Sequence, residues 1–328
     1  MEKLIGKLQE WGTRQVVVLA DSNVAALYPR YFENLADAFP CHFMEIPAGE
    51  NSKNVENAVR VWERLLELNM DRSDTLLMFG GGMVCDLGGF IAATFKRGIH
   101  CVYCPTTLLA MIDAAIGGKT AVNLNHVKNC VGLVRQPDYI MSPDLAFLET
   151  LPAEELKSGF GEIIKYALIA SFPLFDELRK TEVLSADSIQ ESWIQKCVAI
   201  KNRIVESDPC DYKERHVLNF GHTFGHAIEG YQASLGQSIP HGAAVAAGLL
   251  YESELSEKIT GLPHDQLLEI KNLVRRHFDV PEFSKELWRK WVPFMHQDKK
   301  NKEGKINFTL LKEIGTPVIS VYIQDYPF

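Results

Sequence analysis

Two features common in membrane and secreted proteins are missing from this sequence of 328 residues. No apolar run reaches the roughly 20 residues that a helix needs to cross a bilayer. The opening segment, MEKLIGKLQEWGTRQ, has neither the apolar core nor the small-residue cleavage site of a signal peptide. We therefore expect a cytoplasmic protein with no membrane partner.

An excess of positive charge is also missing, since 34 Lys and Arg stand against 42 Asp and Glu, for a net charge of −8. This balance argues against nucleic acid as the partner, because phosphate backbones favour basic faces. An anionic small molecule remains compatible with local basic clusters. The seven cysteines are odd in number and scattered from Cys41 to Cys210, which suits a reducing compartment. Cys101 and Cys104 form a lone CxxC in an apolar run, which favours a structural role.

The two halves of the chain have different patterns. Short apolar runs alternate with helical periodicity in the first half, which predicts a doubly wound, Rossmann-like α/β domain over residues 1–151. The expected strands are 14–19, 42–47, 74–79, 99–105 and 139–143. Amphipathic helical patterns then dominate, which predicts a mostly helical domain over residues 152–328 with a late strand pair near Ile306 and Pro317. The expected helices are 153–170, 188–206, 222–231, 243–260 and 264–277.

A glycine run follows the third predicted strand in LLMFGGGMVCDLGGFIAATF, residues 76–95. The strand delivers Gly80, Gly81 and Gly82 to the start of a helix, where backbone amides can face a pyrophosphate. Asp86, expected in the first helical turn, could accept hydrogen bonds from a ribose or nicotinamide group. The GxGxxG fingerprint is absent after the first strand, so a purely structural turn is the alternative.

Charged side chains gather among small residues in PTTLLAMIDAAIGGKTAVNLNHVKNCVG, residues 105–132. Asp113, Lys119, Lys128 and Asn129 fall close together, and lysines in such a setting suit a phosphate or carboxylate. Arg97, in FKRG, could add a bidentate contact to an anion. A surface loop with ordinary lysines is the alternative.

Three histidines and one carboxylate indicate a metal site in the second half. His222 and His226 lie four apart in LNFGHTFGHAIE, on one helical face, and His241 follows in PHG. Glu162 lies with Lys165 in the apolar segment GEIIKYALI, where a charged pair needs a partner. A glutamate and two histidines with an open position suit zinc or a similar ion. An HxxxH pair alone is commoner as two unrelated histidines, and Thr223 removes the HExxH interpretation.

Together these segments resemble the 3-dehydroquinate synthase family from about Asp21 to Lys300, in the same order. The blocks that carry the resemblance are GGGMVCDLGGFIAATFKRG, PTTLLAMIDAAIGGKTAVN, KNCVG, SGFGEIIKYALI, LNFGHTFGHAIE, PHG with AVAAG, and DKKNKEGKINF. The resemblance implies an NAD-binding first domain, a helical metal-binding second domain, an active site in the cleft between them and a homodimer. It also implies conversion of 3-deoxy-D-arabino-heptulosonate 7-phosphate, a phosphorylated sugar acid, into 3-dehydroquinate and phosphate in the shikimate pathway.

The implied reaction uses NAD without consuming it. A secondary alcohol is oxidised, phosphate is eliminated, the ketone is reduced again, and the opened ring closes by an intramolecular aldol step. A bound Zn²⁺ or Co²⁺ polarises the alcohol oxygen. Such a substrate, with a phosphate and a carboxylate, accounts for the lysines and arginines in the motifs of an acidic chain.

The resemblance implies a role for each matching residue. The metal ligands would be Glu162, His222 and His241, which leaves His226 for proton handling or phosphate contact. The NAD contacts would be Asp21, Asn23, Glu50, Lys53, Gly80, Gly81, Gly82, Asp86, Thr106, Thr107, Lys128 and Thr150. The substrate contacts would be Arg97, Asp113, Lys119, Asn129, Lys165, Lys201, Arg215, Asn219 and one of Lys299 and Lys300.

Some positions depart from the family pattern. Ala243 replaces a glutamate common after the histidine–glycine pair, Ala114 and Ala115 replace serines, and Asp211 stands where glutamate is common. The alternatives are another sugar phosphate cyclase, such as a valiolone-type synthase, and a metal-dependent polyol dehydrogenase of the glycerol type. The first would change the substrate block GGKTAVN, and the second would accumulate NADH.

Overall fold

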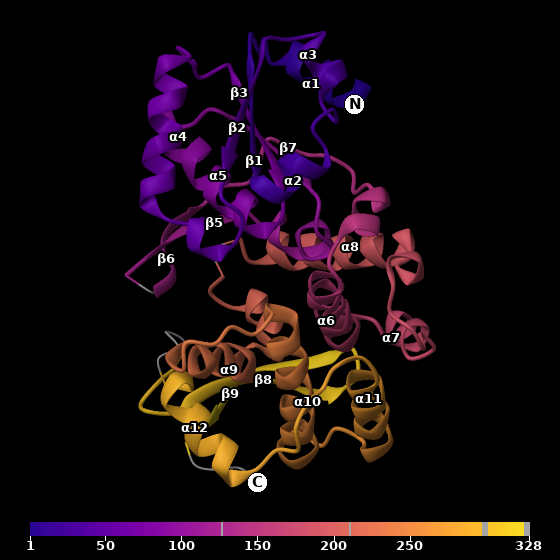
Figure 1. Ribbon diagram of the computed structural model, residues 1–328. Helices are drawn as coiled ribbons and strands as arrows, with labels where there is room; N and C mark the ends of the chain where they lie inside the picture. Colours follow the sequence, from indigo (N-terminus) through magenta and orange to yellow (C-terminus); the bar gives the residue numbers. More distant parts are fainter. Residues whose placement is uncertain (126, 210, 297–300, 325–328) are drawn as a thin grey trace. The chain divides into compact units, whose positions relative to one another are not determined.

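The structure is a computed structural model that describes residues 1–125, 127–209, 211–296 and 301–324 (Figure 1). The chain divides into two compact units, Met1–Thr150 and Leu151–Phe328. Within the described ranges, no helix combines the length and the apolar character needed to span a membrane.

The first unit is built on a five-stranded parallel sheet with strand order β2-β1-β3-β4-β7. Its strands are β1 (Val16–Asp21), β2 (Cys41–Ile46), β3 (Thr75–Gly80), β4 (His100–Pro105) and β7 (Tyr139–Ile140). All six residues of β1 and of β3 are buried, as expected for parallel strands covered on both faces. The predicted doubly wound α/β fold is confirmed. Its strand order reverses direction between β1 and β3, which is where ligands bind in such sheets.

Helices cover the sheet, and two glycines allow one of them to lie close to the strands. The unit contains α1 (Glu2–Glu10), α2 (Ser22–Leu27), α3 (Glu33–Ala36), α4 (Val55–Glu67) and α5 (Gly82–Thr94), with short helices η1 (Glu50–Ser52), η2 (Phe95–Arg97), η3 (Ala110–Ala114) and η4 (Leu145–Thr150). A Cβ on Gly88 would lie 2.2 Å from Met78, and one on Gly89 would lie 2.1 Å from the Tyr103 hydroxyl. Helix α5 therefore packs against β3 and β4 more closely than a helix with side chains could.

An antiparallel hairpin that the sequence pattern did not reveal follows β4. It consists of β5 (Lys119–Leu124) and β6 (Val127–Val134). Most of β6 is exposed, so it lacks the buried alternation by which strands are recognised. The pairing also breaks register between Val122 and Leu124.

The second unit is mostly helical, as predicted. Its helices are α6 (Ala153–Ala170), α7 (Phe172–Leu178), α8 (Glu191–Ser207), α9 (His222–Ser234), α10 (His241–Ile259), α11 (His264–His277) and α12 (Lys285–Met295), with short helices η5 (Ala186–Ser188) and η6 (Glu214–Asn219). The late strand pair is also confirmed, as the antiparallel strands β8 (Ile306–Glu313) and β9 (Thr316–Ile323).

Three helices of this unit approach one another at glycines. On Gly161 of α6, a Cβ would lie 2.7 Å from the carbonyl oxygen of Gly242 in α10, and the Gly242 amide donates to Ser158 Oγ at 2.9 Å. On Gly248, a Cβ would lie 1.8 Å from the carbonyl oxygen of Gly221, just before α9. These contacts hold α6, α9 and α10 close enough for short side chains to meet.

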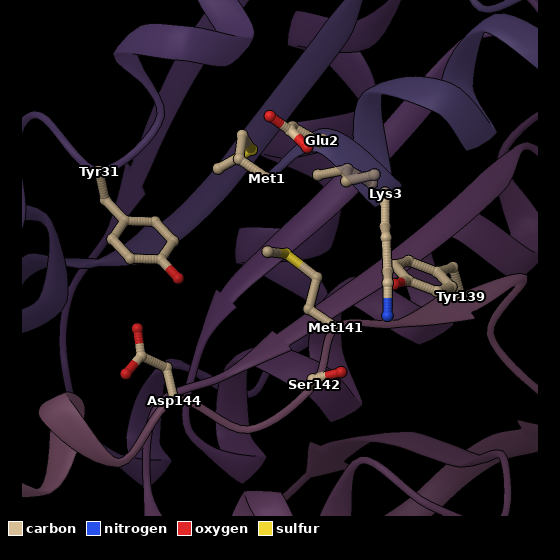
Figure 2. A pocket seen from close by; sticks show the side chains of 9 residues that line it. Met1, Glu2, Lys3, Tyr31, Tyr139, Met141, Ser142 and Asp144 are labelled. Atoms are coloured by element: carbon tan, nitrogen blue, oxygen red, sulfur yellow. The ribbon is translucent and has the colours of Figure 1, made fainter.

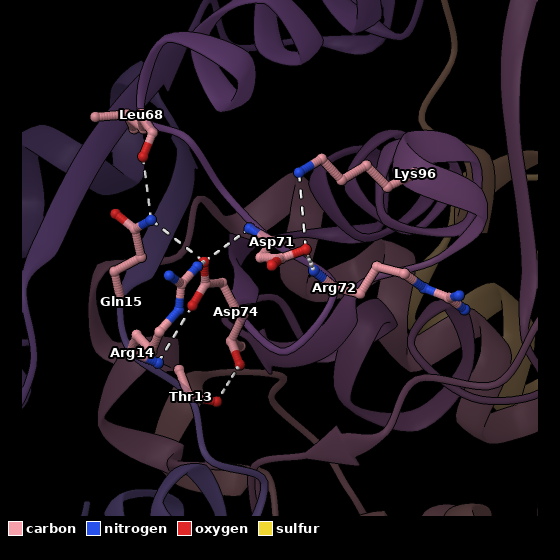
Figure 3. A network of polar contacts seen from close by, with 9 residues as sticks. Thr13, Arg14, Gln15, Leu68, Asp71, Arg72, Asp74 and Lys96 are labelled. Carbon is pink, nitrogen blue, oxygen red and sulfur yellow. Dashed lines mark hydrogen bonds and ion pairs between the residues drawn. The ribbon is translucent and has the colours of Figure 1, made fainter.

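A buried carboxylate organises the amino-terminal edge of the parallel sheet (Figure 3). Asp74, whose side chain is fully buried, accepts from the Arg14 guanidinium at 2.7 Å, the Gln15 amide at 3.2 Å and the Asp71 backbone at 2.8 Å. Burial alone would raise the pKa of Asp74, but these donors outweigh it and lower the pKa. The cluster joins the chain before β1 to the chain before β3.

We predict that Asp74→Asn destabilises the first unit by about 2 kcal/mol at neutral pH, because a charged acceptor of several hydrogen bonds is lost. The pKa of Asp74 is lowered in the folded protein, so its stabilising contribution is present above the unfolded pKa and is lost as the pH falls through the folded pKa. Calorimetric unfolding of the full chain should therefore show a difference between wild type and variant at neutral pH that vanishes in acid.

The matched control for this prediction is Asp71→Asn. The Asp71 side chain is 61% exposed, accepts from the neighbouring Arg72 amide at 2.8 Å and approaches Lys96 at 3.8 Å, so a change to the similarly shaped asparagine should alter stability little. Equal destabilisation by both variants, or a wild-type advantage that persists in acid, would contradict the assigned role of Asp74.

Candidate metal centre and nucleotide site

Three predicted ligands converge in the second unit. Glu162 lies in the middle of α6, His222 is the first residue of α9 and His241 is the first residue of α10. Glu162 Oε1 lies 3.3 Å from His222 Nε2 and 3.4 Å from His241 Nε2. One ligand atom from each residue lies within 4.8 Å of the others, so all three can reach a single ion.

The outer nitrogen of each imidazole has its own acceptor. His222 Nδ1 lies 3.2 Å from the carbonyl oxygen of Phe220, and His241 Nδ1 lies 3.4 Å from Glu229 Oε2. If each Nδ1 carries the proton and donates it, both Nε2 lone pairs are directed at the position of the ion. Metal-binding histidines are commonly oriented by such contacts.

The carboxylate of Glu162, at the centre of the three ligands, is fully buried. A buried carboxylate stays ionised only when positively charged groups lie close to it. Lys165 Nζ lies 2.5 Å from Glu162 Oε2, yet neither oxygen of Glu162 receives a hydrogen bond of good geometry from the described residues. Burial would raise the pKa of Glu162, but Lys165 and His222 hold it well below its ordinary value. Burial lowers the pKa of His222, which favours the neutral form that ligates a metal. For His241, burial is outweighed by Glu162 and Glu229, and the pKa is raised to about 9. An ionised carboxylate between two imidazoles fits a divalent cation.

Other predicted residues of this unit are divided between its interior and its surface. Lys201 and Arg215 are buried, Asn219 is partly exposed and His226 is exposed. The His226 ring centroid lies 5.3 Å from that of His222 and 6.3 Å from that of His241. His226 therefore lies beside the three converging residues but is absent from the set whose atoms reach a common point. Lys299 and Lys300 lie outside the described residues.

The carboxyl edge of the parallel sheet brings together several residues predicted to contact NAD. Asp21 ends β1 and accepts from the backbone of Asn23 at 3.0 Å. A Cβ on Gly80 would lie 3.2 Å from Asp21 Oδ2, and one on Gly81 would lie 2.9 Å from the Thr107 side chain. Buried Thr106 donates its amide to the carbonyl of Gly80 at 3.0 Å. The glycines thus leave a backbone surface at the β1–β3 switch point, where a nucleotide can approach.

A buried lysine joins two further residues of the predicted NAD set. Lys53 is 4% exposed, and its Nζ lies 3.0 Å from both Asp86 Oδ2 and Glu50 Oε1. Glu50 also accepts from Asn123 of β5 at 2.9 Å. Asp86 is the fifth residue of α5, one turn later than the sequence suggested.

The remaining predicted residues of the first unit are spread over its loops and hairpin. Asp113 lies in η3, which is a π-helical turn, a geometry often found at functional sites. Lys119, Lys128 and Asn129 are exposed on the β5–β6 hairpin, and the Asn129 amide donates to Asn123 Oδ1 at 2.9 Å. Arg97 is exposed at the end of η2, and Thr150 contacts the Tyr28 hydroxyl at 2.5 Å.

Sequence reasoning missed Glu229. It lies seven residues after His222 and three after His226, so the three share one face of α9. That spacing was visible in LNFGHTFGHAIE, but its contact with His241 of another helix was not.

The first unit also contains a cavity of about 420 Å³ that lies apart from the predicted NAD residues (Figure 2). It is lined by Met1, Glu2, Lys3, Leu4, Tyr31, Tyr139, Met141, Ser142 and Asp144. None of the predicted site residues lines it. Its single lysine stands among two acids, which does not favour an anionic ligand.

Comparison with known families covers most of the chain. The 3-dehydroquinate synthase N-terminal family matches residues 43–158, and the 3-dehydroquinate synthase C-terminal family matches residues 159–301. A 3-dehydroquinate synthase of Dehalococcoides mccartyi is 38% identical over 312 residues, covering 93% of this chain and 86% of its own. That of Parabacteroides distasonis is 36% identical over 302 residues, covering 92% and 85%.

Solved structures with the same fold include two sugar phosphate cyclases. A 2-deoxy-scyllo-inosose synthase complexed with carbaglucose-6-phosphate, NAD⁺ and Co²⁺ has a TM-score of 0.83 and 24% identity, covering 98% of this chain and 92% of its own. A 2-epi-5-epi-valiolone synthase from Streptomyces hygroscopicus, with NAD⁺ and Zn²⁺ bound, has a TM-score of 0.80 and 27% identity, covering 96% and 88%. On the two family matches and the identity to curated relatives, this chain belongs to the 3-dehydroquinate synthase family.

Proposed function

We propose that the protein converts 3-deoxy-D-arabino-heptulosonate 7-phosphate into 3-dehydroquinate and phosphate. The observation that carries the proposal is the convergence of Glu162, His222 and His241 in a chain that matches both 3-dehydroquinate synthase families. The relatives of that name are 36–38% identical, against 27% for the valiolone-type synthase. The product belongs to the route to chorismate and the aromatic amino acids.

Each unit would hold one of the groups that the reaction needs. Glu162, His222 and His241 would hold a Zn²⁺ or Co²⁺ ion, and the glycines after β3 with Asp21, Lys53 and Asp86 would hold NAD. When bound, the ion supplies a Lewis acid for an alcohol oxygen, and NAD supplies a reversible hydride acceptor. Substrate roles for Arg97, Asp113, Lys119, Asn129, Lys201, Arg215 and Asn219 stay predictions from the resemblance.

Side chains beside the three ligands have separate tasks. Lys165 holds Glu162 in its ionised form, because its ammonium group lies 2.5 Å from the carboxylate in a fully buried environment. His226 is exposed and adjacent to His222, so its imidazole can exchange protons with a bound substrate while the other two histidines ligate. We assign His226 to proton transfer during loss of phosphate.

We further propose a homodimer in which strand β6 contacts its counterpart. Among the described residues, β6 pairs only with β5, so one strand edge is left for another partner. Val127, Val131 and Val134 on β6 are 57%, 38% and 54% exposed. An apolar strand edge is self-complementary about a two-fold axis, and proteins seldom leave one uncovered.

A cytoplasmic location is proposed as well. Cys41, Cys85, Cys101, Cys104, Cys130 and Cys197, the six described cysteines, are free thiols, as expected in a reducing compartment. Recovery of the protein outside the cytoplasmic fraction of its native cells would contradict this assignment.

The reaction is tested with purified protein, NAD⁺, Zn²⁺ or Co²⁺ and the heptulosonate phosphate. We expect phosphate and dehydroquinate to form in equal amounts without accumulating NADH, and we expect activity to require added NAD⁺ when the protein has been stripped of nucleotide. The measurements are a phosphate assay, absorbance of reduced nicotinamide and product identification by mass spectrometry. Turnover of sedoheptulose 7-phosphate instead, or steady NADH formation from glycerol, would overturn the proposal.

The metal ligands are tested by Glu162→Gln and His241→Ala. Each variant should lose Zn²⁺ affinity by more than the roughly 10- to 100-fold that follows loss of an outer partner, because a direct ligand is removed. Metal analysis after dialysis measures this. Glu154→Gln, at an exposed position on the same helix, is the matched control and should bind metal normally.

His226→Ala should retain the metal but slow phosphate release by about 100-fold or more, the usual contribution of a general acid or base. Single-turnover phosphate release, with metal content measured on the same sample, separates the two effects. Loss of metal from this variant together with retained metal in His241→Ala would reverse the assignment of the two histidines.

The dimer is tested by Val131→Lys, which places a charge on the β6 edge. Light scattering should show a dimer for wild type and a monomer for the variant. Val183→Lys is the control, because Val183 is 74% exposed in the second unit and should leave the mass unchanged. A wild-type monomer, or a variant that stays dimeric, would refute this interface.

A further inference from the structure

Helix α9 begins at His222 without a side-chain cap of its own. The residue before it, Gly221, has a left-handed backbone with φ of +82° and offers no side-chain acceptor. The first amides of a helix have no partner within the helix, and a buried helix start therefore needs acceptors from elsewhere. Gly221 is buried, as is Thr223 after the histidine. Some other part of the chain has to supply those acceptors.

The acceptor is a carboxylate from the next helix. Glu252 of α10 has no exposed surface. Its Oε2 accepts from the Gly221 amide at 2.6 Å, and its Oε1 accepts from the amides of Thr223 at 3.1 Å and Phe224 at 3.3 Å. Glu252 thus caps a helix from about thirty residues further along the chain.

The backbones of α9 and α10 lie so close together at this contact that there is little room for either helix to move. Gly248, one turn before Glu252, could not carry a Cβ because it would lie 1.8 Å from the Gly221 carbonyl oxygen. A Cβ on Gly225 of α9 would lie 3.3 Å from the Ala244 carbonyl oxygen on α10. The two helices are therefore antiparallel and in close contact. His241, Gly248 and Glu252 are spaced by seven and four residues, which places them on one face of α10.

A glutamate on each of the two helices, α9 and α10, contacts the histidine residue or the backbone beside it at the start of the other helix. Glu229 of α9 contacts the His241 imidazole, and Glu252 of α10 binds the amides on either side of His222. We propose that Glu252 is a positioning residue for the metal centre, fixing the first turn of α9 so that the His222 imidazole faces Glu162. This inference rests on the proposed role of His222 and His241 as ligands.

A residue whose only task was to cap the start of α9 would not have to be a glutamate. Burying a carboxylate is costly, and burial raises the pKa of Glu252 to about 8 even though the three amides oppose the shift. A hydroxyl or amide cap would satisfy amides at lower cost. What the carboxylate adds is simultaneous contact with three amides of one turn, which fixes the orientation of that turn against α10.

The test is a Co²⁺ titration of Glu252→Gln, read by the visible absorption of the bound ion. Glutamine keeps the size of the side chain but turns an amide group toward the amides of α9, so at least one contact is lost. We expect Co²⁺ affinity to fall by about 10- to 100-fold, as for other partners that orient metal ligands, and the absorption bands to shift. Glu254→Gln is the matched control, because Glu254 lies on the same helix and pairs with Lys271 at 2.7 Å; it should bind Co²⁺ as wild type does.

If Glu252→Gln does not fold, Glu252→Asp takes its place, because it retains the carboxyl group and shortens its reach, and an intermediate loss of Co²⁺ affinity is expected. Unchanged Co²⁺ affinity and spectrum in a folded variant, even with a lower melting temperature, would overturn the positioning role and leave the proposed function standing. A wild-type protein that binds Co²⁺ but releases no phosphate would overturn the proposed function and leave the positioning role intact. Wild-type protein that binds no Co²⁺ would refute both.

Discussion

The metal centre of the second unit depends on the buried negative charge of Glu162. Glu162 has no exposed surface, and a carboxylate in that position remains ionised only with positive or hydrogen-bonding groups at close range. Lys165, three residues later on α6, supplies one such group, and the imidazoles of His222 and His241 supply the others. Because both histidines begin their helices, the starts of α9 and α10 have to converge on the middle of α6. The close glycine contacts between these helices make that convergence possible. The metal centre is therefore a property of how three helices pack, and changes to their packing are changes to its geometry.

In the first unit, the residues that stabilise the fold and the residues proposed to bind a ligand lie at opposite edges of the same sheet. At the amino-terminal edge of the sheet, the side chain of Asp74 is satisfied by groups around it and has no further capacity for a ligand. At the carboxyl edge, Asp21 and the glycines after β3 present backbone and carboxylate groups where the strand order reverses. This polarity is general in parallel α/β sheets, because all strands end on the same side. A change at one edge can therefore affect folding with little effect on binding.

Much of this organisation could be predicted from local pattern. The strands of the parallel sheet are continuous apolar runs, and α6 and α11 begin and end where helical periodicity does. The converging ligands followed from the family resemblance, because HxxxH spacing alone favoured His226 as the partner of His222. Other features have no local signal. The hairpin of β5 and β6 is exposed and irregular, so its residues carry no pattern that predicts strands. Glu252 looks like any helical glutamate, and only the packing of α10 on α9 shows that it caps a distant helix start. Periodicity in the sequence predicts single helices and strands, but it does not predict which side chains of different elements contact one another.

Strand β8 comes late in the chain, and its position affects when the two helices that begin with metal-site histidines can complete their contacts. Thr223, next to His222, donates its hydroxyl to the carbonyl of Asn307 on β8 at 3.2 Å, and Ser256 of α10 accepts from the Leu311 amide at 2.9 Å. Both helices that begin with a metal-site histidine are thus braced by residues that leave the ribosome some fifty or more positions after those helices. The contacts of α9 and α10 are therefore complete only once β8 has been synthesised.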